Sequence, residues 1–232
     1  MNTDENSETV FHASDPDHQD NGSVHSDVED DVSSVPSGPL SVLPGKRHMV
    51  PALAIFAIFY AVSSLGIRYS AVNRLSASGR EIYGSGELWR SLTALAVHGD
   101  IVHLLSNGIV LVFFGWMLRA YFGFLFFPII SLTLGIWTNL VVTCLYDPSI
   151  SVIGCSGMTH GMVSLWVVLY LKHDVDSRLP RRFLRAIGFV LIMMVPSAVS
   201  ADVSYHSHLV GFLTGLVSGI CMLPFAVVRD PS

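Results

Sequence analysis

Six long apolar stretches without charged side chains alternate with polar segments along the chain. They span residues 49–67, 101–118, 121–146, 149–171, 186–201 and 203–228. As helices, stretches of about this length cross the roughly 30 Å hydrocarbon core of a bilayer. The fifth is the shortest, so we expect its helix to begin earlier, near Phe183, with Arg185 reaching the membrane surface. The pattern predicts an all-α membrane protein, a bundle of six transmembrane helices.

The connections between these stretches are short, with one clear exception. Arg119 and Ala120 alone separate the second stretch from the third, which predicts a tight hairpin at that point. The longest connection, residues 68–100, carries aromatic and apolar side chains such as Tyr83 and Trp89. We therefore expect this first loop to be embedded partly in the membrane interface.

Composition supports this division and sets apart an acidic tail. The chain is 51% hydrophobic and only 13% charged. Residues 1–45 hold ten acidic residues and no Lys or Arg, and a segment so polar is predicted to be a disordered cytoplasmic tail. It lacks a basic start followed by an apolar core, so we expect no cleaved signal peptide. The membrane domain then spans residues 46–228, and residues 229–232 form a short cytoplasmic C-terminus.

The basic residues predict the orientation of the domain. If the N-terminus is cytoplasmic, nine Lys and Arg residues lie on the cytoplasmic side and four lie on the other side. Cytoplasmic loops are enriched in basic residues, so both termini are expected in the cytoplasm. The second, fourth and sixth helices then all start near the outer leaflet.

Each of these three helices carries unusual polar residues near its start. In the second, Asp100 is a candidate N-cap, and His103 and Asn107 follow four residues apart on one face. Ser156 begins the fourth helix, and His208 lies in the first turns of the sixth. These polar side chains can therefore meet at one depth, although they are far apart in sequence.

Glycines provide a way to bring the serine and the histidine together. Gly154 and Gly157 flank the serine, and small residues recur at intervals of four on both helices, at Gly157 and Gly161 and at Gly211, Gly215 and Gly219. Such stripes usually serve close helix packing, which is the main interpretation of Gly161, Gly215 and Gly219. Here the packing would also bring Ser156 within reach of His208, as a Ser–His pair without an obvious carboxylate. His103, Asn107 and the Ser156 N–H could then stabilise an oxyanion.

Four motifs make the chain resemble the rhomboid intramembrane serine proteases. They are Glu87-Leu88-Trp89-Arg90, His98-x4-His103-x3-Asn107, Gly154-Cys155-Ser156-Gly157 and Ser207-His208-x2-Gly211-x3-Gly215. The resemblance extends over residues 49–228, in the compact six-helix form common in bacteria and archaea. It implies that Ser156 is the nucleophile and His208 the general base, with His103 and Asn107 at the oxyanion. It further implies that Trp89 and Arg90 hold the first loop.

The resemblance also implies the partners. The substrates would be transmembrane proteins in a lipid bilayer, cut near the outer face of a prokaryotic cell membrane, with the fifth helix as a candidate lateral gate. We expect no cofactor, no metal and no nucleic-acid partner, whereas the oligomeric state and the substrate are not predicted.

Three further histidines qualify this interpretation. The family often has a tyrosine or phenylalanine four residues after the serine, where it packs against the catalytic histidine; this chain has His160, whose imidazole could stack there. Charged, it would lower the basicity of His208. His98 is interpreted as bracing the loop, and His206 as structural or facing solvent.

Two alternatives remain open. One is a non-catalytic rhomboid-like protein that binds membrane clients without cutting them. The other is a membrane metal or ion site, to which His98, His103, His206, His208 and Asp202 could contribute. Intramembrane ionisable residues are often functional, but the chain has no His-Glu-x-x-His motif.

Overall fold

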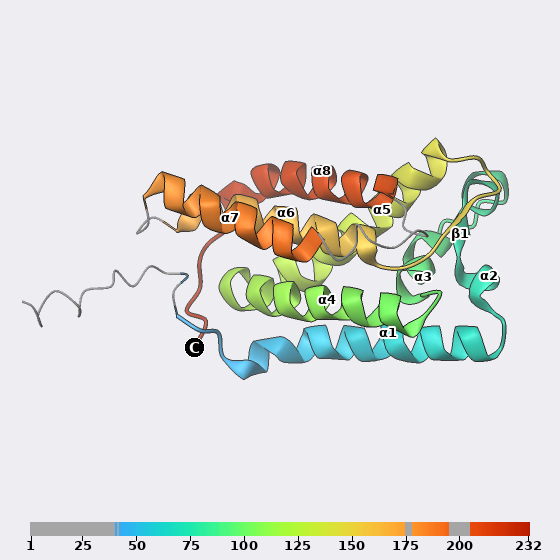
Figure 1. The fold of residues 1–232 in the computed structure, drawn as a ribbon, viewed down its shortest axis with the longest axis horizontal. Helices are drawn as coiled ribbons and strands as arrows, with labels where there is room; N and C mark the ends of the chain where they lie inside the picture. Colours follow the sequence, from blue (N-terminus) through green and yellow to red (C-terminus); the bar gives the residue numbers. More distant parts are fainter. Residues whose placement is uncertain (1–39, 41, 175–177, 195–204) are drawn as a thin grey trace, which may run out of the picture. The chain divides into compact units, whose positions relative to one another are not determined.

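The protein is a helical membrane bundle, as the apolar stretches predict. In the computed structural model, the described residues are Leu40 and residues 42–174, 178–194 and 205–232. The long helices are α1 (Val50–Arg68), α4 (Ile101–Phe122), α5 (Ser131–Leu145), α6 (Ser156–His173), α7 (Leu179–Met194) and α8 (Tyr205–Met222). Each of the six predicted stretches thus contains or overlaps a helix (Figure 1).

Short elements join and flank these helices. The first loop contains α2 (Val72–Leu75), β1 (Ala77–Ser78), a π-helical turn (Arg80–Gly84) and α3 (Arg90–Ala96). Strand β2 (Ser151–Val152) precedes α6 and pairs antiparallel with β1. Further short helical turns lie at Lys46–Met49, Leu125–Ile130 and Leu223–Phe225.

Four of the described helical segments are long and apolar enough to cross a membrane. They are Lys46–Arg68, Ile101–Phe122, Leu125–Leu145 and Tyr205–Phe225. The described part of α7 has 16 residues, and the end of the predicted fifth span, residues 195–201, lies outside the described residues. Helix α6 has 18 residues but a more polar composition, because it packs against α4, α5, α7 and α8. A helix surrounded by other helices can carry polar side chains that lipid would not tolerate.

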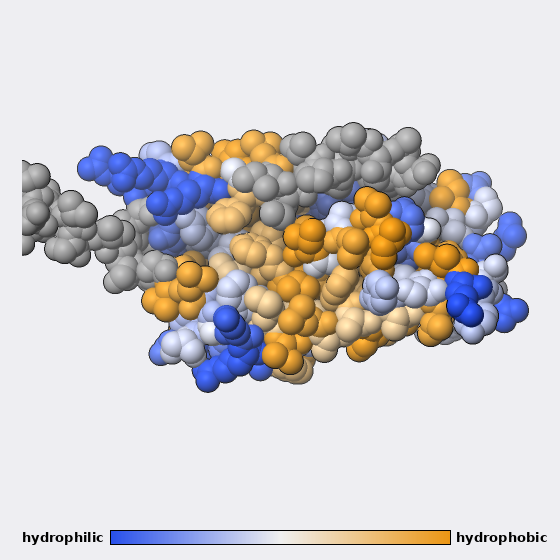
Figure 2. All heavy atoms as spheres, turned by 60° about the horizontal axis from the view of Figure 1, so that its bottom comes forward, coloured by the Kyte–Doolittle hydropathy of each residue, from blue (hydrophilic) through white to orange (hydrophobic). Residues whose placement is uncertain are grey.

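The exposed surface agrees with a position in lipid. Figure 2 shows an apolar area across the middle of the face that includes α1, with hydrophilic residues towards both ends. On α1, the exposed side chains include Val50, Leu53, Ile58 and Leu65. An apolar band between two polar ends is the arrangement that a bilayer requires.

Helices α6 and α8 lie in backbone contact through their glycines. A Cβ atom added at Gly211 would lie 2.1 Å from the Gly157 carbonyl oxygen, and one at Gly215 would lie 2.2 Å from that of Gly161. No side chain fits at such distances, so the glycine stripes pack these two helices as the four-residue spacing predicts.

Two helix ends differ from the sequence prediction. Helix α4 continues through Arg119 and Ala120 to Phe122, so the predicted hairpin at those residues is wrong. The turn lies at Gly123, whose φ of 88° is a conformation that glycine adopts without strain. Helix α7 begins at Leu179, earlier than Phe183, with an exposed basic first turn.

The residues before α1 and after α8 meet at one end of the bundle. The Gly45 N–H donates to the Pro231 carbonyl at 2.7 Å, and the Gly45 carbonyl accepts from the Trp116 indole at 3.1 Å. The Arg229 N–H donates to the carbonyl of Tyr121 at 2.8 Å. Gly45 belongs to the predicted acidic tail, of which residues 1–39 and 41 lie outside the described residues, so the prediction of disorder there remains untested.

Adding one methyl group at a glycine of the α6–α8 contact should affect stability differently from adding one at a glycine outside it. Gly215→Ala should lower the free energy of unfolding by about 3 kcal/mol, the upper end of the range for overpacking, because the new Cβ meets backbone that cannot move aside. Gly188→Ala on α7 is the matched control, since a Cβ there meets nothing within 4 Å; it should leave the free energy of unfolding unchanged or raise it by up to about 1 kcal/mol, because alanine favours a helix over glycine. Unfolding in mixed micelles measures both, and equal effects would contradict the packing described.

Candidate active site

Ser156 is the first residue of α6 and borders a cavity of about 550 Å³. The residues before it turn sharply, with Gly154 at a φ of 92°. The Gly154 N–H donates to the Ala94 carbonyl at 2.8 Å, which ties this turn to α3. The cavity lining includes Gly99, Asp100, His103, Asn139, Tyr146, Ser151, Gly154, Ser156, Gly157 and Ser207. The serine is therefore buried in protein but open to a partly polar hollow.

His103 reaches this cavity from the first turn of α4. Asp100 caps the helix as predicted, because its carboxylate accepts from the His103 N–H at 2.8 Å. The His103 imidazole lies against the serine turn: a Cβ at Gly154 would be 3.0 Å from its Cε1 atom. Two of the predicted site residues, His103 and Ser156, thus line one cavity.

Asn107 follows one turn later on α4 and is buried. Its side-chain amide nitrogen has no hydrogen-bond partner among the described residues. Leaving such a buried donor unpaired costs about 1–3 kcal/mol, so it is an uncommon feature in a folded core. The amide is available to an acceptor that the described residues do not provide.

His208 lies in the first turn of α8. Its ring stacks on that of His160, which in turn is hydrogen-bonded to the backbone carbonyl of Ser156. The His160 and His208 rings stack, with centroids 3.9 Å apart and planes 12° from parallel. One turn of helix separates His160 from Ser156, whose carbonyl oxygen lies 2.7 Å from His160 Nδ1. The stack expected at position 160 therefore forms. His208 is not among the cavity-lining residues, whereas its neighbour Ser207 is.

His98 is completely buried between α1 and the serine turn. The Ser63 hydroxyl donates to the Ala96 carbonyl at 2.8 Å, so its oxygen is left to accept from His98 Nδ1–H at 3.2 Å. On the other side of the ring, Nε2 accepts from the Cys155 N–H at 3.4 Å. Both nitrogens are used by the neutral ring, and burial, followed by the nearby charge of His103, lowers the pKa of His98 to about 4. This agrees with the predicted bracing role.

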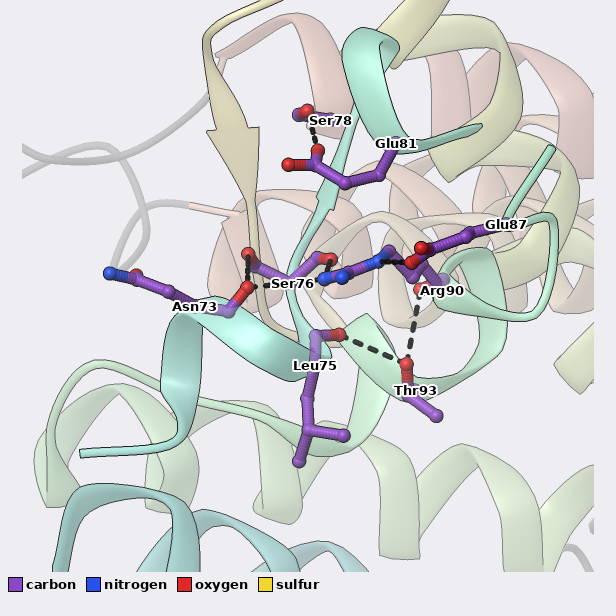
Figure 3. Close-up of polar contacts among 8 residues, drawn as sticks. All are labelled: Asn73, Leu75, Ser76, Ser78, Glu81, Glu87, Arg90 and Thr93. Carbon is purple, nitrogen blue, oxygen red and sulfur yellow. Dashed lines mark hydrogen bonds and ion pairs between the residues drawn. The ribbon is translucent and has the colours of Figure 1, made fainter. Parts of the chain in front are cut away.

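Arg90 and Trp89 lie where three segments of the first loop meet. Figure 3 shows the Arg90 guanidinium between the Glu87 carboxylate and the carbonyl oxygens of Asn73 and Ser76, the latter two both at 3.1 Å. The guanidinium also lies 5.0 Å from the centre of the Trp89 ring, which is about half exposed. One cation thus joins three parts of the first loop, an arrangement that suits the predicted structural role of both residues.

The sequence prediction missed two polar residues that support the site. Ser63 fixes the His98 tautomer from α1, and Asn139 on α5 donates to the Ser91 carbonyl at 2.9 Å, which anchors α3. Both are polar residues within apolar stretches, and this contrast is the feature of the sequence that could have identified them.

His206 lies apart from the stacked pair. Its ring is exposed and lies 3.1 Å from the Tyr146 hydroxyl, as a structural role would predict. Within the described part of the chain, no three His, Cys, Asp or Glu side chains are grouped closely enough to hold a metal ion. Asp202, the carboxylate of the alternative metal site, lies outside the described residues.

Comparison with known proteins relates this site to one family. The Rhomboid domain family matches residues 85–225 of the chain. RHOMBOID-like protein 2 of Arabidopsis thaliana is 28% identical over 144 residues, which cover 62% of this chain and 45% of that protein. RHOMBOID-like protein 5 of the same plant is 26% identical over 189 residues, 80% of this chain and 56% of that protein.

A bacterial protein matches over more of its own length. "Putative rhomboid protease YdcA" of Bacillus subtilis (strain 168) is 26% identical over 175 residues, covering 73% of this chain and 86% of that protein. In contrast, the chain spans only about half the length of the two Arabidopsis relatives described above. The matched range contains every predicted site residue, from Trp89 to Gly215.

The two hydrogen bonds of neutral His98 predict a pH effect on stability. The unfolded chain protonates this histidine near pH 6.5 and the folded chain only near pH 4, so the free energy of unfolding should fall as the pH drops through this window. Between pH 7 and pH 5 the contribution is roughly 2 kcal/mol. His98→Gln should reduce the pH-dependent loss by about this amount in SDS unfolding titrations.

The exposed His206 provides the control for this measurement. His206→Gln should keep the pH dependence that His98 contributes, because the exposed His206 ring takes no part in the brace. An unchanged pH dependence in His98→Gln would show that the brace does not depend on a neutral ring.

Proposed function

Since the chain belongs to the rhomboid family, we propose that it is an intramembrane serine endopeptidase that cleaves transmembrane-helix substrates near the outer membrane face. Ser156 is the nucleophile and His208 the general base in this proposal. One observation carries it: Ser156 begins a central helix beside a cavity, and a stacked ring one turn away links it to His208.

The local backbone suits Ser156 to nucleophilic attack. Gly154 and Gly157 add no side chains beside the serine, and the first backbone N–H groups of α6 have neither an intrahelical partner nor a side-chain cap. In the proposed reaction the serine oxygen attacks the substrate carbonyl while His208 accepts the serine proton. That proton then passes to the leaving amine, and water hydrolyses the acyl-enzyme by the same two groups.

His103 and Asn107 are the proposed donors to the negative oxygen that forms during attack. The unpaired amide of Asn107 and the position of His103 beside Gly154 support this role. Donors that are already oriented need no reorganisation at the moment of reaction, and each such donor typically contributes 10²–10³-fold in rate. The Ser156 backbone N–H is the third proposed donor.

In this proposal, the cavity beside Ser156 admits the water that hydrolysis requires. Polar groups of Asp100, Asn139 and Ser151 line it, and irregular backbone is tolerated at membrane depth where it faces such a cavity. A substrate helix would approach from the lipid beside α7, the proposed lateral gate, and its unwound end would expose a peptide bond. Trp89 and Arg90 would hold the first loop above this site. A prokaryotic cell membrane with both termini in the cytoplasm is the proposed location.

The proposed roles of Ser156 and His208 are tested by cleavage of a single-span substrate in proteoliposomes. Ser156→Ala and His208→Ala should each reduce the rate by at least about 10³-fold, with no effect of a chelator on the wild type. Ser164→Ala on the same helix and His206→Ala on α8 are the matched controls and should cut normally. No cleavage by any variant across a panel of substrates would favour client binding without proteolysis. Cleavage that survives Ser156→Ala but stops with a chelator would favour a metal site.

Asn107 offers a test in which activity and stability change in opposite directions. Asn107→Leu should lower the cleavage rate by about 10²-fold or more, because one oxyanion donor is lost. Its free energy of unfolding should stay equal or increase, since an unpaired buried amide is replaced by an apolar side chain. Parallel losses of rate and stability would assign Asn107 a structural role instead.

A further inference from the structure

The turn that follows α4 lies at the end of the bundle opposite Ser156. Helix α4 begins beside the cavity at Asp100 and ends roughly 30 Å further along, where Gly123 turns the chain. We propose that Arg119 and Arg229 bind the phosphate group of an anionic phospholipid at this turn. The proposal concerns a separate site and does not depend on the proposed function.

Arg119 lies in the last turn of α4 and holds a donor without an acceptor. Its Nε atom is buried and has no hydrogen-bond partner among the described residues. The guanidinium carbon lies 5.5 Å from the centre of the Phe124 ring, so the charged group is beside the turn. A buried N–H of a cation is costly to leave unpaired, and it indicates an acceptor that the described residues do not supply.

Arg229 reaches the same turn from the segment that follows α8. Figure 1 shows this segment, in red, running from α8 across the end of the bundle towards the start of α1. The Arg229 N–H donates to the Tyr121 carbonyl at 2.8 Å, and a Cβ atom added at Gly123 would lie 2.6 Å from the Arg229 Cζ atom. The guanidinium therefore occupies the space that a side chain at position 123 would fill. Two guanidinium groups from distant parts of the chain thus lie at one turn.

The charge around this turn is positive. The three segments that meet here contain four Lys and Arg residues and one acidic residue; they are residues 45–49, 119–124 and 226–232. The acidic residue is Asp230, whose carboxylate accepts from the Ser232 N–H at 3.0 Å. Within the described residues no salt bridge joins Arg119 or Arg229 to a carboxylate. A ligand with net negative charge is favoured here, and guanidinium groups match phosphate oxygens through paired hydrogen bonds.

The position of the turn favours a lipid over a free phosphate ion. The turn lies between two segments that are long and apolar enough to cross a membrane, Ile101–Phe122 and Leu125–Leu145. It is therefore expected at the membrane surface, where the lipid headgroups lie. The side chains of Phe124, Leu125 and Ile129 are exposed and offer an apolar surface to the acyl chains. A zwitterionic headgroup would bring a cation of its own, so an anionic phospholipid suits the two arginines better.

Native mass spectrometry of the full chain in detergent micelles, titrated with phosphatidylglycerol, tests the site by measuring the Kd of the first bound lipid. Arg119→Gln and Arg229→Gln should each raise this Kd by at least about tenfold, because each removes a charge-assisted hydrogen bond to phosphate. The Arg229 side chain is exposed, so Arg229→Gln keeps the test decisive if Arg119→Gln does not fold. A wild type that retains no phosphatidylglycerol would overturn the proposal.

Arg178→Gln is the matched control, because it removes one exposed positive charge at the same end of the bundle. Helices α4 and α6 end together, with the Phe122 and His173 rings 5.6 Å apart, and Arg182 donates to the Leu171 carbonyl there at 3.2 Å. The control should change the Kd by less than about twofold, as expected for a solvated surface charge. A rise equal to that of the two site variants would show diffuse attraction to the whole surface and overturn the site.

Competing compounds identify the chemistry of the ligand. Phosphatidylcholine with the same acyl chains should bind at least about tenfold more weakly than phosphatidylglycerol. Millimolar inorganic phosphate, at constant ionic strength, should leave the bound lipid in place. Equal binding of phosphatidylcholine would overturn the requirement for a net negative charge, and displacement by inorganic phosphate would overturn the lipid as the occupant.

Discussion

The backbone contact between α6 and α8 is the constraint on which the rest of the structure depends. Lipid gives helices little hydrophobic reason to associate, so their packing relies on close contact at small residues. Gly211 lies against the backbone of Gly157, and the contact repeats one turn further along. Ser156 directly precedes Gly157, and His208 comes three residues before Gly211. The contact that joins the helices therefore also limits how far these two side chains can lie apart.

The first loop holds the other side of the serine turn. Strand β1 pairs with β2, the Ala94 carbonyl accepts from Gly154, and neutral His98 accepts from the Cys155 N–H. Arg90 in turn joins the parts of the loop to each other (Figure 3). Ser156 is thus held on one side by the contact between α6 and α8 and on the other side by the folded first loop. Such rigid support is what a preorganised site requires, because misplacement by about 1 Å is costly in catalysis.

The sequence was sufficient to predict the bundle and to propose candidate site residues, because charged and polar groups are costly in lipid and stand out in apolar stretches. Helix ends were harder to predict. Arg119 looks like a boundary, yet a long basic side chain can extend to the surface while the helix continues, and the glycine at position 123 ends it. The role of Ser63 could not be predicted either, since it depends on a histidine 35 residues away in sequence. Roles that arise from one specific contact become visible only in three dimensions.

The histidines near Ser156 differ in role because their surroundings fix their protons differently. His98 has both nitrogens occupied and can serve only as a brace. His160 has Nδ1 bound to the Ser156 carbonyl and offers its face to His208. In a Ser-His-Asp triad a carboxylate orients the histidine through a hydrogen bond. Within the described residues no salt bridge joins His208 to a carboxylate, and the His160 ring stacks against it. The proposed base is thus packed against a ring and has no carboxylate beside it among the described residues.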